Sequence, residues 1–475
     1  MKNYLHTALL ACIFAGMLTA CANVGIDETR AHDQRTSFAP ALDSAAATFS
    51  ELANATTLTD RWGGVLGGAA YRIEVPKSNW NGKLVMYAHG YVGTDNALTV
   101  LNPPIRRHLI DHGYAWAASS YSKNYYDVRA GIEDTNALAL AFTRIAADNG
   151  RALAVPNKIY IAGRSMGGHI AAAAIEAETL ATARNKVRYD GALPLCGALG
   201  DTALADYMGA YQLAARQLAG LPAANFPSAD WASIAPDVRA TLFNSNKSFA
   251  TPSVQGARLK SIVMHLTGGP RPIFDEGFAV DSLQNGVWAA FTGVGTLDGI
   301  LSKNVVDTHH IRYRFDAPEA VLTTFNAGIT RATAAPDANL QRRDGLRWVP
   351  KINGEFSVPV LTLHTLGDML VPFSMEQIYR RRATAKGNAD KLVQRAIRAP
   401  AHCDFTIAEQ ARAFADLVNW VERGVKPPGD DMLTAETIAQ PNYGCIFTDN
   451  TMDADDAPAI KNGRAPGKLA SCPTN

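Results

Sequence analysis

The feature that most constrains the fold is a strand, a sharp turn and a helix between residues 159 and 169. The sequence there reads Ile-Tyr-Ile-Ala-Gly-Arg-Ser-Met-Gly-Gly-His. Gly163 and Gly167 stand two residues on either side of Ser165, and a turn of this kind needs glycines there because strand and helix approach too closely for a Cβ atom. The pattern predicts that Ser165 projects from a sheet edge as a nucleophile; the alternative is an ordinary turn.

A serine hydroxyl is a weak nucleophile until a neighbouring imidazole takes its proton, so a histidine is needed later in the chain. His402 lies between the last predicted strand and the final predicted core helix, in a loop that can return over the serine. His169, on the helix after the serine, is better explained by packing, and His309 and His310 lie in an irregular insertion. We therefore predict His402 as the base, against a solvated loop histidine.

The imidazole in turn needs a carboxylate that fixes its tautomer and stabilises the imidazolium. Asp368 follows a predicted strand directly, and Val371-Pro372 marks the turn into the next helix. Asp201, after an earlier strand, is the rival, and an Asx-turn is the structural alternative for either residue. We predict Asp368 as the acid.

Acyl transfer places negative charge on a substrate oxygen, and preorganised N–H donors stabilise that charge. The backbone N–H of Met166 lies at the start of the helix after Ser165. The loop His-Gly-Tyr-Val-Gly at residues 89–93 offers a second donor, the N–H of Tyr91. We predict these two groups as an oxyanion hole. The Tyr91 ring either lines the acyl pocket or simply packs.

Strands and helices alternate around these residues. We expect strands at 71–75, 83–87, 115–119, 158–162 and 191–195, with helices at 96–112, 128–149 and 167–179. The alternation resumes with strands at 358–364 and 391–397 and helices at 375–386 and 406–423. Parallel strands joined by crossover helices give an α/β fold, a mostly parallel sheet with helices on both faces.

The alternation defines the expected segments of the chain. Residues 61–196 and 357–424 form two parts of one core, and residues 197–356 form a large inserted cap, in which only 201–219 and 317–333 look helical. Residues 21–60 read as a tether with a helix near 41–53, and residues 425–475 as a C-terminal tail tied by a disulfide.

The order Ser165, Asp368, His402, with the His-Gly loop ahead of the serine, resembles the α/β-hydrolase superfamily, specifically its secreted esterase and lipase-like members. The resemblance covers residues 71–423 without the cap. It implies the α/β-hydrolase fold. The pair His402-Cys403 is also similar to feruloyl esterases and tannases, which bridge that cysteine to one beside the serine; here Arg164 and Met166 flank the serine.

The first residues are similar to a bacterial lipoprotein signal. Lys2 precedes an apolar stretch at 8–18, and Leu-Thr-Ala-Cys follows at 18–21. The resemblance implies removal of residues 1–20, lipidation of Cys21 and, with Ala22 beside it, a place in the cell envelope at the outer membrane or periplasm. The alternative is an ordinary signal peptide cleaved near Ala20 or Ala22. Both predict export.

Cysteine numbers agree with lipidation. Loss of Cys12 with the signal leaves five cysteines, an odd set for an oxidising compartment, and lipidation of Cys21 leaves four. Three pairings exist. We favour Cys445 with Cys472, because both lie in a Pro-, Gly- and Asp-rich tail with little core of its own; Cys196 and Cys403 then remain as the other pair.

Composition limits the partners. Hydrophobic residues make up 47% and charged residues 19%, so the chain is globular. A net charge of +1 gives no field to gather nucleic acid. After the N-terminal segment no apolar run reaches the ~20 residues that span a bilayer, so we expect membrane contact through the lipid anchor only. The chain has no zinc-spaced ligand cluster, P-loop or dinucleotide fingerprint, and we expect no cofactor.

These observations predict an exported serine hydrolase that cleaves small carboxylic esters through an acyl-enzyme. The alternatives are a peptidase or amidase with the same triad, in which Asp275 and Glu276 hold a substrate amine, and a non-catalytic binding protein on this fold. Cap aromatics either wall an apolar pocket or form the cap's own core: Phe274, Phe278, Trp288, Phe291 and Tyr313. Arg271 and Arg312 are candidates to bind an acidic group.

Overall fold

The structure is a computed structural model. It describes residues 35, 37–40, 49–222, 226, 230–244, 248–290, 297–465, 467–469 and 472–473. The expectations for the signal peptide, for Cys21, for most of the tether and for Phe291 concern residues outside these ranges.

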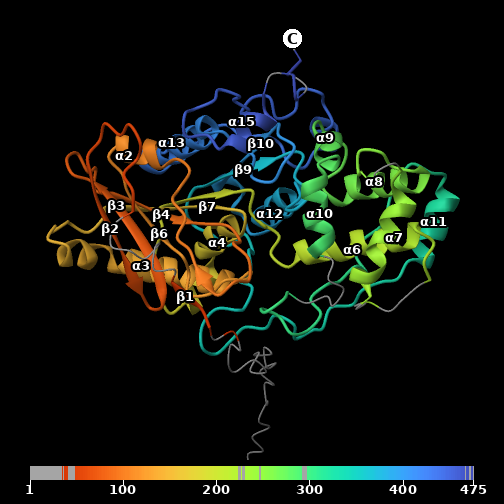
Figure 1. The fold of residues 1–475 in the computed structure, drawn as a ribbon, viewed down its shortest axis with the longest axis horizontal. Helices are drawn as coiled ribbons and strands as arrows, with labels where there is room; N and C mark the ends of the chain where they lie inside the picture. The colour runs from red at the N-terminus through yellow and green to blue at the C-terminus, as the bar shows by residue number, and fades with distance from the viewer. Residues whose placement is uncertain are drawn as a thin grey trace, which may run out of the picture.

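An eight-stranded sheet forms the core of the molecule (Figure 1). Its order is β10-β9-β8-β7-β4-β6-β3-β2. Only β3 in this sheet runs against its neighbours, pairing antiparallel with both β2 and β6. This mostly parallel sheet, with a nucleophile turn after a central strand, is the α/β-hydrolase fold expected from the sequence. The strands are β2 (Thr59–Leu66), β3 (Ala69–Pro76), β4 (Lys83–Ala88), β6 (Ala115–Ser119), β7 (Lys158–Arg164), β8 (Gly191–Leu195), β9 (Val360–Thr365) and β10 (Leu392–Ile397).

Both faces of the sheet are buried, because alternate side chains of each strand enter different cores. In β4, Leu84 and Met86 join one hydrophobic cluster, whereas Val85 and Tyr87 join the other. Helices α3 (Val128–Asp148), α4 (Met166–Ala174) and α12 (Ser374–Ala385) contribute to the first cluster. Helices α2 (Arg106–Asp111) and α13 (Ile407–Arg423) contribute to the second.

The folded core begins earlier than expected, within the segment that was predicted to be a tether. Strand β2 begins at Thr59, and before it Phe49 is buried against Trp116, with the guanidinium of Arg106 5.0 Å from the Phe49 ring centre. Trp62 is the one buried hydrophobic side chain of β2, because the strand lies at the sheet edge and carries Gly63-Gly64. An edge strand of this kind gives almost no hydrophobic signal in the sequence.

The cap is a helical lobe beside the sheet (Figure 1). It has its own hydrophobic core, built largely from aromatic side chains. The sequence indicated two helices, whereas the structure has α6 (Ala203–Leu218), α7 (Trp231–Leu242), α8 (Val254–Leu266), α9 (Phe274–Phe278), α10 (Asp281–Ala290) and α11 (Glu319–Gly328). Two of these helices contain residues that disfavour a helix in sequence-based prediction: Pro236 lies inside α7, and Gly286 inside α10.

Two expected helices are interrupted. In place of a helix over 96–112, the chain forms β5 (Ala97–Leu98), which pairs with β1 (Ala39–Pro40), and then the short α2. Pro103-Pro104 explains the break, since proline lacks an N–H and clashes with the preceding turn. The helix expected at 167–179 is divided into α4 and α5 (Ala177–Thr182).

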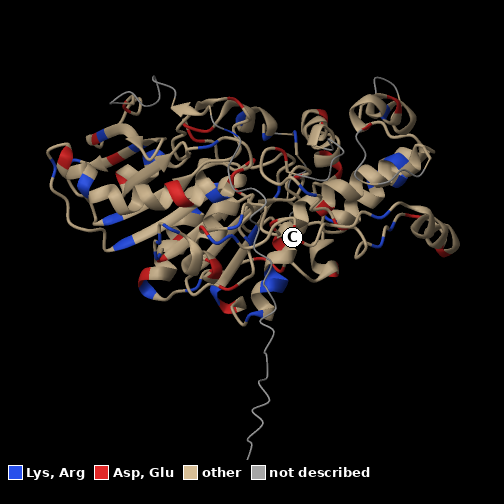
Figure 2. Ribbon diagram, turned by 90° about the horizontal axis from the view of Figure 1, so that it is seen from below, with Lys and Arg blue, Asp and Glu red and all other residues tan. Residues whose placement is uncertain are grey.

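The C-terminal tail crosses α13 and the end of β10. It contains α14 (Ala435–Ile438) and α15 (Pro458–Gly463), and a short 3₁₀ helix, η2 (Ala389–Lys391), precedes β10. The Cys445–Cys472 disulfide closes the tail, as expected. Among the described residues, every helix is too short or too polar to cross a membrane. Figure 2 shows lysine, arginine and acidic residues interspersed over both lobes.

Candidate active site

Ser165 lies at a strained turn between β7 and α4. Its φ of 58° is in the left-handed region that non-glycine residues rarely adopt. A Cβ atom on Gly163 would lie 2.0 Å from the carbonyl oxygen of Gly167, and one on Gly167 would lie 2.0 Å from that of Ala88. Glycine is therefore required at both positions, and the turn has the geometry that the sequence predicted.

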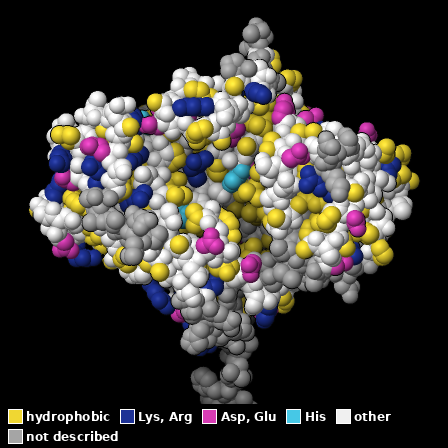
Figure 3. Space-filling view, viewed as in Figure 1, with side chains coloured by type: hydrophobic (Ala, Val, Ile, Leu, Met, Phe, Trp, Pro, Cys, Tyr) yellow, Lys and Arg dark blue, Asp and Glu magenta, His cyan; other side chains and the backbone are white. Residues whose placement is uncertain are grey.

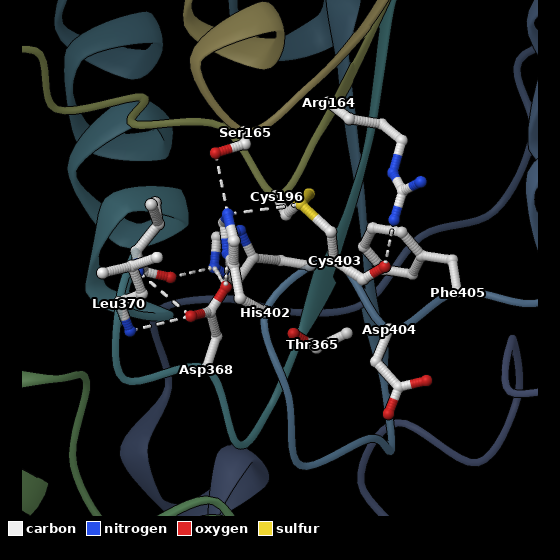
Figure 4. The surroundings of a disulfide bond; sticks show 12 residues. Arg164, Ser165, Cys196, Thr365, Asp368, Leu370, His402, Cys403, Asp404 and Phe405 are labelled. Atoms are coloured by element: carbon white, nitrogen blue, oxygen red, sulfur yellow. Dashed lines mark hydrogen bonds and ion pairs between the residues drawn. A yellow bond between two sulfur atoms is a disulfide. The ribbon is translucent and has the colours of Figure 1, made fainter. Parts of the chain in front are cut away.

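Ser165, His402 and Asp368 form a continuous hydrogen-bonded line (Figure 4). Nε2 of His402 lies 2.7 Å from the Ser165 Oγ, and Nδ1 lies 2.5 Å from the Asp368 Oδ2. A carboxylate can only accept, so Nδ1 carries a proton and Nε2 is left to accept the serine proton. His402 is partly exposed, at 16%, whereas Asp368 is fully buried. The structure thus brings together the three residues that the sequence nominated.

The backbone fixes the carboxylate of Asp368. Its Oδ1 accepts hydrogen bonds from the N–H groups of Leu370 at 2.9 Å and Val371 at 3.0 Å, which leaves Oδ2 for the histidine. The loop also meets its neighbours closely, because a Cβ on Gly367 would lie 2.5 Å from the Cα of Pro400. The acid loop and the histidine loop are therefore in direct contact.

Three connections hold the histidine loop. Thr365 Oγ1 donates to the carbonyl of Ala401 at 2.8 Å, and Arg164 Nη2 donates to the carbonyl of Cys403 at 2.6 Å. A disulfide joins Cys403 to Cys196, which is the remaining pair in the favoured cysteine assignment (Figure 4). Each flanking carbonyl of His402 is therefore anchored to the end of a sheet strand.

The same cluster is a poor metal site. Cys196, His402 and Cys403 have ligand atoms within 4.8 Å of one another. However, the two sulfurs are bonded to each other and offer no thiolate, and Nε2 of His402 is engaged with the serine.

Two backbone N–H groups are available beside the serine. Those of Met166 and Tyr91 donate no hydrogen bond within the described residues. A Cβ on Gly90 would lie 3.1 Å from the Ser165 Cβ, so this loop passes close to the nucleophile. The oxyanion hole formed by these two N–H groups remains a prediction. Tyr91 is 51% exposed, so it does not pack in the core.

The rival residues are engaged elsewhere. His169 is buried between the Tyr126 hydroxyl at 3.1 Å and the Pro350 carbonyl at 2.8 Å. Asp201 accepts from Arg382 at 2.6 Å and joins the cap to the core. His309 bonds Thr333 on the cap surface. Their contacts are structural.

The two predicted substrate-binding residues, Phe274 and Trp288, lie in the core of the cap and do not form a pocket wall. Trp288 is buried in the cap core among other aromatic rings, and Phe274 packs against Phe278. The cap needs these rings because it is large enough to require its own core. Phe278 and Tyr313 are buried in the same core.

The polar candidates of the cap also have partners in the protein. Arg271 is buried and donates to the Leu366 carbonyl at 2.7 Å. Arg312 pairs with Glu319, and Asp275 pairs with Lys260 at 2.8 Å.

The surface between the two lobes is hollowed. Figure 3 shows hydrophobic side chains lining this hollow, with a histidine side chain exposed in it. Two further cavities lie at the cap. One of about 550 Å³ lies between α6, α8 and α12, and one of about 380 Å³ lies beside α11. The residues that line these two cavities do not include the triad.

Sequence reasoning missed a second histidine–carboxylate pair. His364 on β9 and Glu376 on α12 are both fully buried behind Asp368. The signal available was a histidine at an inward position of a buried strand, which needs a polar partner. Arg164 and Gly90 were also missed, because their roles depend on loops far away in sequence.

Comparisons with known proteins give limited matches. No family model matches the chain. An o-phthalyl amidase of Xanthobacter agilis is 32% identical over 74 residues, which is 16% of this chain and 16% of the amidase. The match therefore spans about one sixth of that enzyme.

Solved structures of similar topology include feruloyl esterase B of Aspergillus oryzae, with a TM-score of 0.40, 15% identity and coverage of 81% of this chain and 85% of that one. The cell wall degrading esterase LipA of Xanthomonas oryzae has a TM-score of 0.32, 13% identity and coverage of 69% and 77%. An acylaminoacyl peptidase of Pyrococcus horikoshii has a TM-score of 0.36, 9% identity and coverage of 82% and 44%. These scores are low, so the fold assignment rests on the sheet topology and the nucleophile turn.

Proposed function

We propose that the protein is a serine hydrolase that cleaves carboxylic esters through an acyl-enzyme. The observation that carries the proposal is the line of hydrogen bonds from the Ser165 Oγ through His402 to the buried Asp368. Hydrogen-bonded nucleophile, base and orienting carboxylate are recognised by this geometry and not by position in the chain. The N–H groups of Met166 and Tyr91, which donate no hydrogen bond in the described part of the chain, support the same reaction.

Each residue has a defined part in the reaction. The Ser165 Oγ attacks the ester carbonyl carbon while its proton passes to Nε2 of His402. The carbonyl oxygen becomes an oxyanion, which the N–H groups of Met166 and Tyr91 stabilise. His402 then protonates the leaving alcohol. Water, deprotonated by the same nitrogen, attacks the acyl-enzyme, and the acid leaves with regeneration of Ser165.

The substrate class we propose is a small or medium ester with an apolar or aromatic part. The hydrophobic hollow between the lobes supports it (Figure 3). We expect the cap, which lies beside the sheet, to obstruct long polymers. No cofactor, metal or nucleic acid enters this reaction.

A fluorophosphonate probe and a series of 4-nitrophenyl esters of graded acyl length test the proposal. We expect the probe to label Ser165 and the short esters to turn over, with both lost in Ser165→Ala. The matched control is Ser122→Ala, which removes a hydroxyl outside the site. A folded wild-type protein that neither reacts with the probe nor hydrolyses any ester would favour a non-catalytic binding protein.

Amide hydrolysis is the second candidate, and the match to an o-phthalyl amidase favours it. The triad serves both reactions, which differ in the leaving group that His402 must protonate. Matched pairs of ester and anilide with the same acyl group distinguish them. A kcat/KM for the anilide equal to or above that of the ester would replace the esterase proposal with an amidase.

For location, we propose export and attachment to the cell envelope through a lipid on Cys21. Two disulfides are typical of proteins outside the cytoplasm. Cys21→Ser in the full chain should move the protein from the membrane fraction to the soluble fraction. Unchanged partition would contradict the lipid anchor and leave export by an ordinary signal peptide.

A further inference from the structure

A buried ionisable pair lies directly behind the acid of the triad. The two ring nitrogens of His364, on β9, face different carboxylates. Its Nε2 lies 4.0 Å from the Asp368 Oδ2. Its Nδ1 lies 3.4 Å from the Glu376 Oε1. All three side chains have no exposed surface. The triad thus continues inward from Asp368 to a second histidine and a second carboxylate.

The hydrogen bonds indicate where the protons lie. Nε2 of His364 is 2.8 Å from the carbonyl oxygen of Val371, which can only accept, so Nε2 carries a proton. Glu376 Oε2 accepts from Thr362 Oγ1 at 2.7 Å and from the side-chain amide of Gln394. Two donors on one oxygen favour the ionised carboxylate. Its other oxygen, Oε1, then needs a donor, and the facing atom is Nδ1 of His364.

The charge count supports a second proton on the ring. Besides the two histidines, two guanidinium groups act on the two buried carboxylates: that of Arg271 beside Asp368, and that of Arg380, one helical turn after Glu376 on α12. Arg380 is partly exposed and bonds Gln394. With a neutral His364, two buried carboxylates would have one fully buried cation, and a buried charge without a partner is costly.

The pKa of His364 follows the same balance. Burial lowers it, but the neighbouring carboxylates of Glu376 and Asp368 outweigh burial, so the pKa is raised above its ordinary value. The other titratable neighbours are the hydroxyls of Tyr207, Tyr379 and Tyr443, whose pKa values burial raises, and they add no charge near neutral pH.

We propose that His364 is a permanent imidazolium, held by Glu376, that positions Asp368 and sets how readily His402 accepts a proton. The inference deepens the proposed function and rests on it for its catalytic consequence. A cation on the inner side of Asp368 reduces the negative potential that His402 experiences on the outer side. The base is thereby kept deprotonated to lower pH, ready to accept the serine proton. His364 is a positioning residue and does not touch substrate.

Neutron diffraction from wild-type crystals grown at about pD 8 tests the charge without any substitution. We expect deuterium on both Nδ1 and Nε2 of His364 and none on the oxygens of Glu376. Deuterium on Nε2 alone would overturn the proposal. This measurement does not depend on catalysis. It therefore remains valid even if wild-type Ser165 does not react with the fluorophosphonate probe and the proposed function fails.

The pH dependence of kcat/KM tests the consequence. The double variant His364→Gln with Glu376→Gln replaces the ion pair by two amides of similar size and leaves no unpaired buried charge. We expect the midpoint of its acidic limb to move to higher pH by about half a unit or more. Probe labelling of Ser165 at pH 8 should persist, because the triad itself is intact.

His169→Gln is the matched control. His169 is also fully buried, but burial lowers its pKa and keeps the ring neutral. Its loss should lower the melting temperature without moving the acidic limb. An acidic limb that stays in place in the double variant, in a wild type shown to be active, would overturn the proposal. If the double variant does not fold, the neutron result alone decides it.

Discussion

Arg164 and Cys403 are joined by a hydrogen bond of 2.6 Å from Nη2 to a backbone carbonyl. Arg164 immediately precedes Ser165, and Cys403 immediately follows His402, so this bond connects the loops that carry the two residues (Figure 4). The disulfide from Cys403 to Cys196 runs beside it. The distance between Ser165 and His402 is therefore fixed by two cross-connections as well as by their own hydrogen bond.

The first prediction concerns the arginine. Arg164→Met keeps an unbranched apolar stem and removes the donor. We expect kcat to fall about tenfold with little change in KM, because a base held loosely samples the productive geometry less often. Arg184→Met, which changes an exposed arginine, is the control. Equal kcat values in Arg164→Met and wild type would show that the bond does not position the histidine.

The second prediction concerns the active-site disulfide. Replacing Cys196 and Cys403 together with serine should lower both kcat and the melting temperature, with about 2–5 kcal/mol of stability lost. The matched control replaces Cys445 and Cys472, and there we expect lower stability with kcat retained. Non-reducing peptide mapping of the wild type should recover the Cys196–Cys403 pair. Free thiols at both positions would contradict the brace.

The candidate triad could be predicted from the sequence because each of its residues has a local signature. Ser165 lies between glycines that the turn requires, Asp368 directly follows a buried strand, and His402 precedes the last amphipathic helix. Each signature belongs to the few residues around it. A parallel sheet then brings such loops together, since the carboxyl ends of its strands lie on one edge.

Other parts of the molecule have no local signature. The sequence around Trp288 is compatible with a pocket wall and with a core position, and only the surrounding rings show that it fills the cap. Strand β2 has too few buried side chains to be recognised before its pairing with β3 is known. His364 and Glu376 become a pair only when β9 and α12 pack together. These features are products of tertiary packing.

The third prediction concerns the C-terminal tail. The side chain of Arg464 is fully buried, with Nη1 2.7 Å from Glu409 and Nε 3.0 Å from Asp404, two residues after His402. Arg464→Leu leaves two buried carboxylates without their cation and should cost about 3–5 kcal/mol in urea unfolding. The control is Arg107→Leu, which breaks a more exposed pair with Asp455 and should cost less than about 1 kcal/mol. Equal losses would contradict a structural role for the tail.

The last prediction concerns the pH dependence of stability. Asp206 on α6 lines the cavity between cap and core. Burial raises the pKa of its carboxyl from the ordinary 3.8 to about 7, although the N–H of Asp307 donates to it and lowers the pKa. Between about pH 4 and pH 7 the folded protein holds a proton here that the unfolded chain has released. The stability contributed by this group is therefore complete below about pH 4 and is lost as pH rises through 7.

Asp206→Asn isolates that effect. Asparagine keeps an oxygen for the Asp307 N–H but cannot ionise, so the variant should match the wild type in melting temperature near pH 4.5 and exceed it at pH 8. Glu176, whose pKa burial also raises to about 7, is present in both proteins and cancels in the comparison. Asp316→Asn, which changes an exposed carboxylate of the same lobe, is the control. A difference between variant and wild type that is the same at both pH values would show that Asp206 does not carry a proton in the folded state.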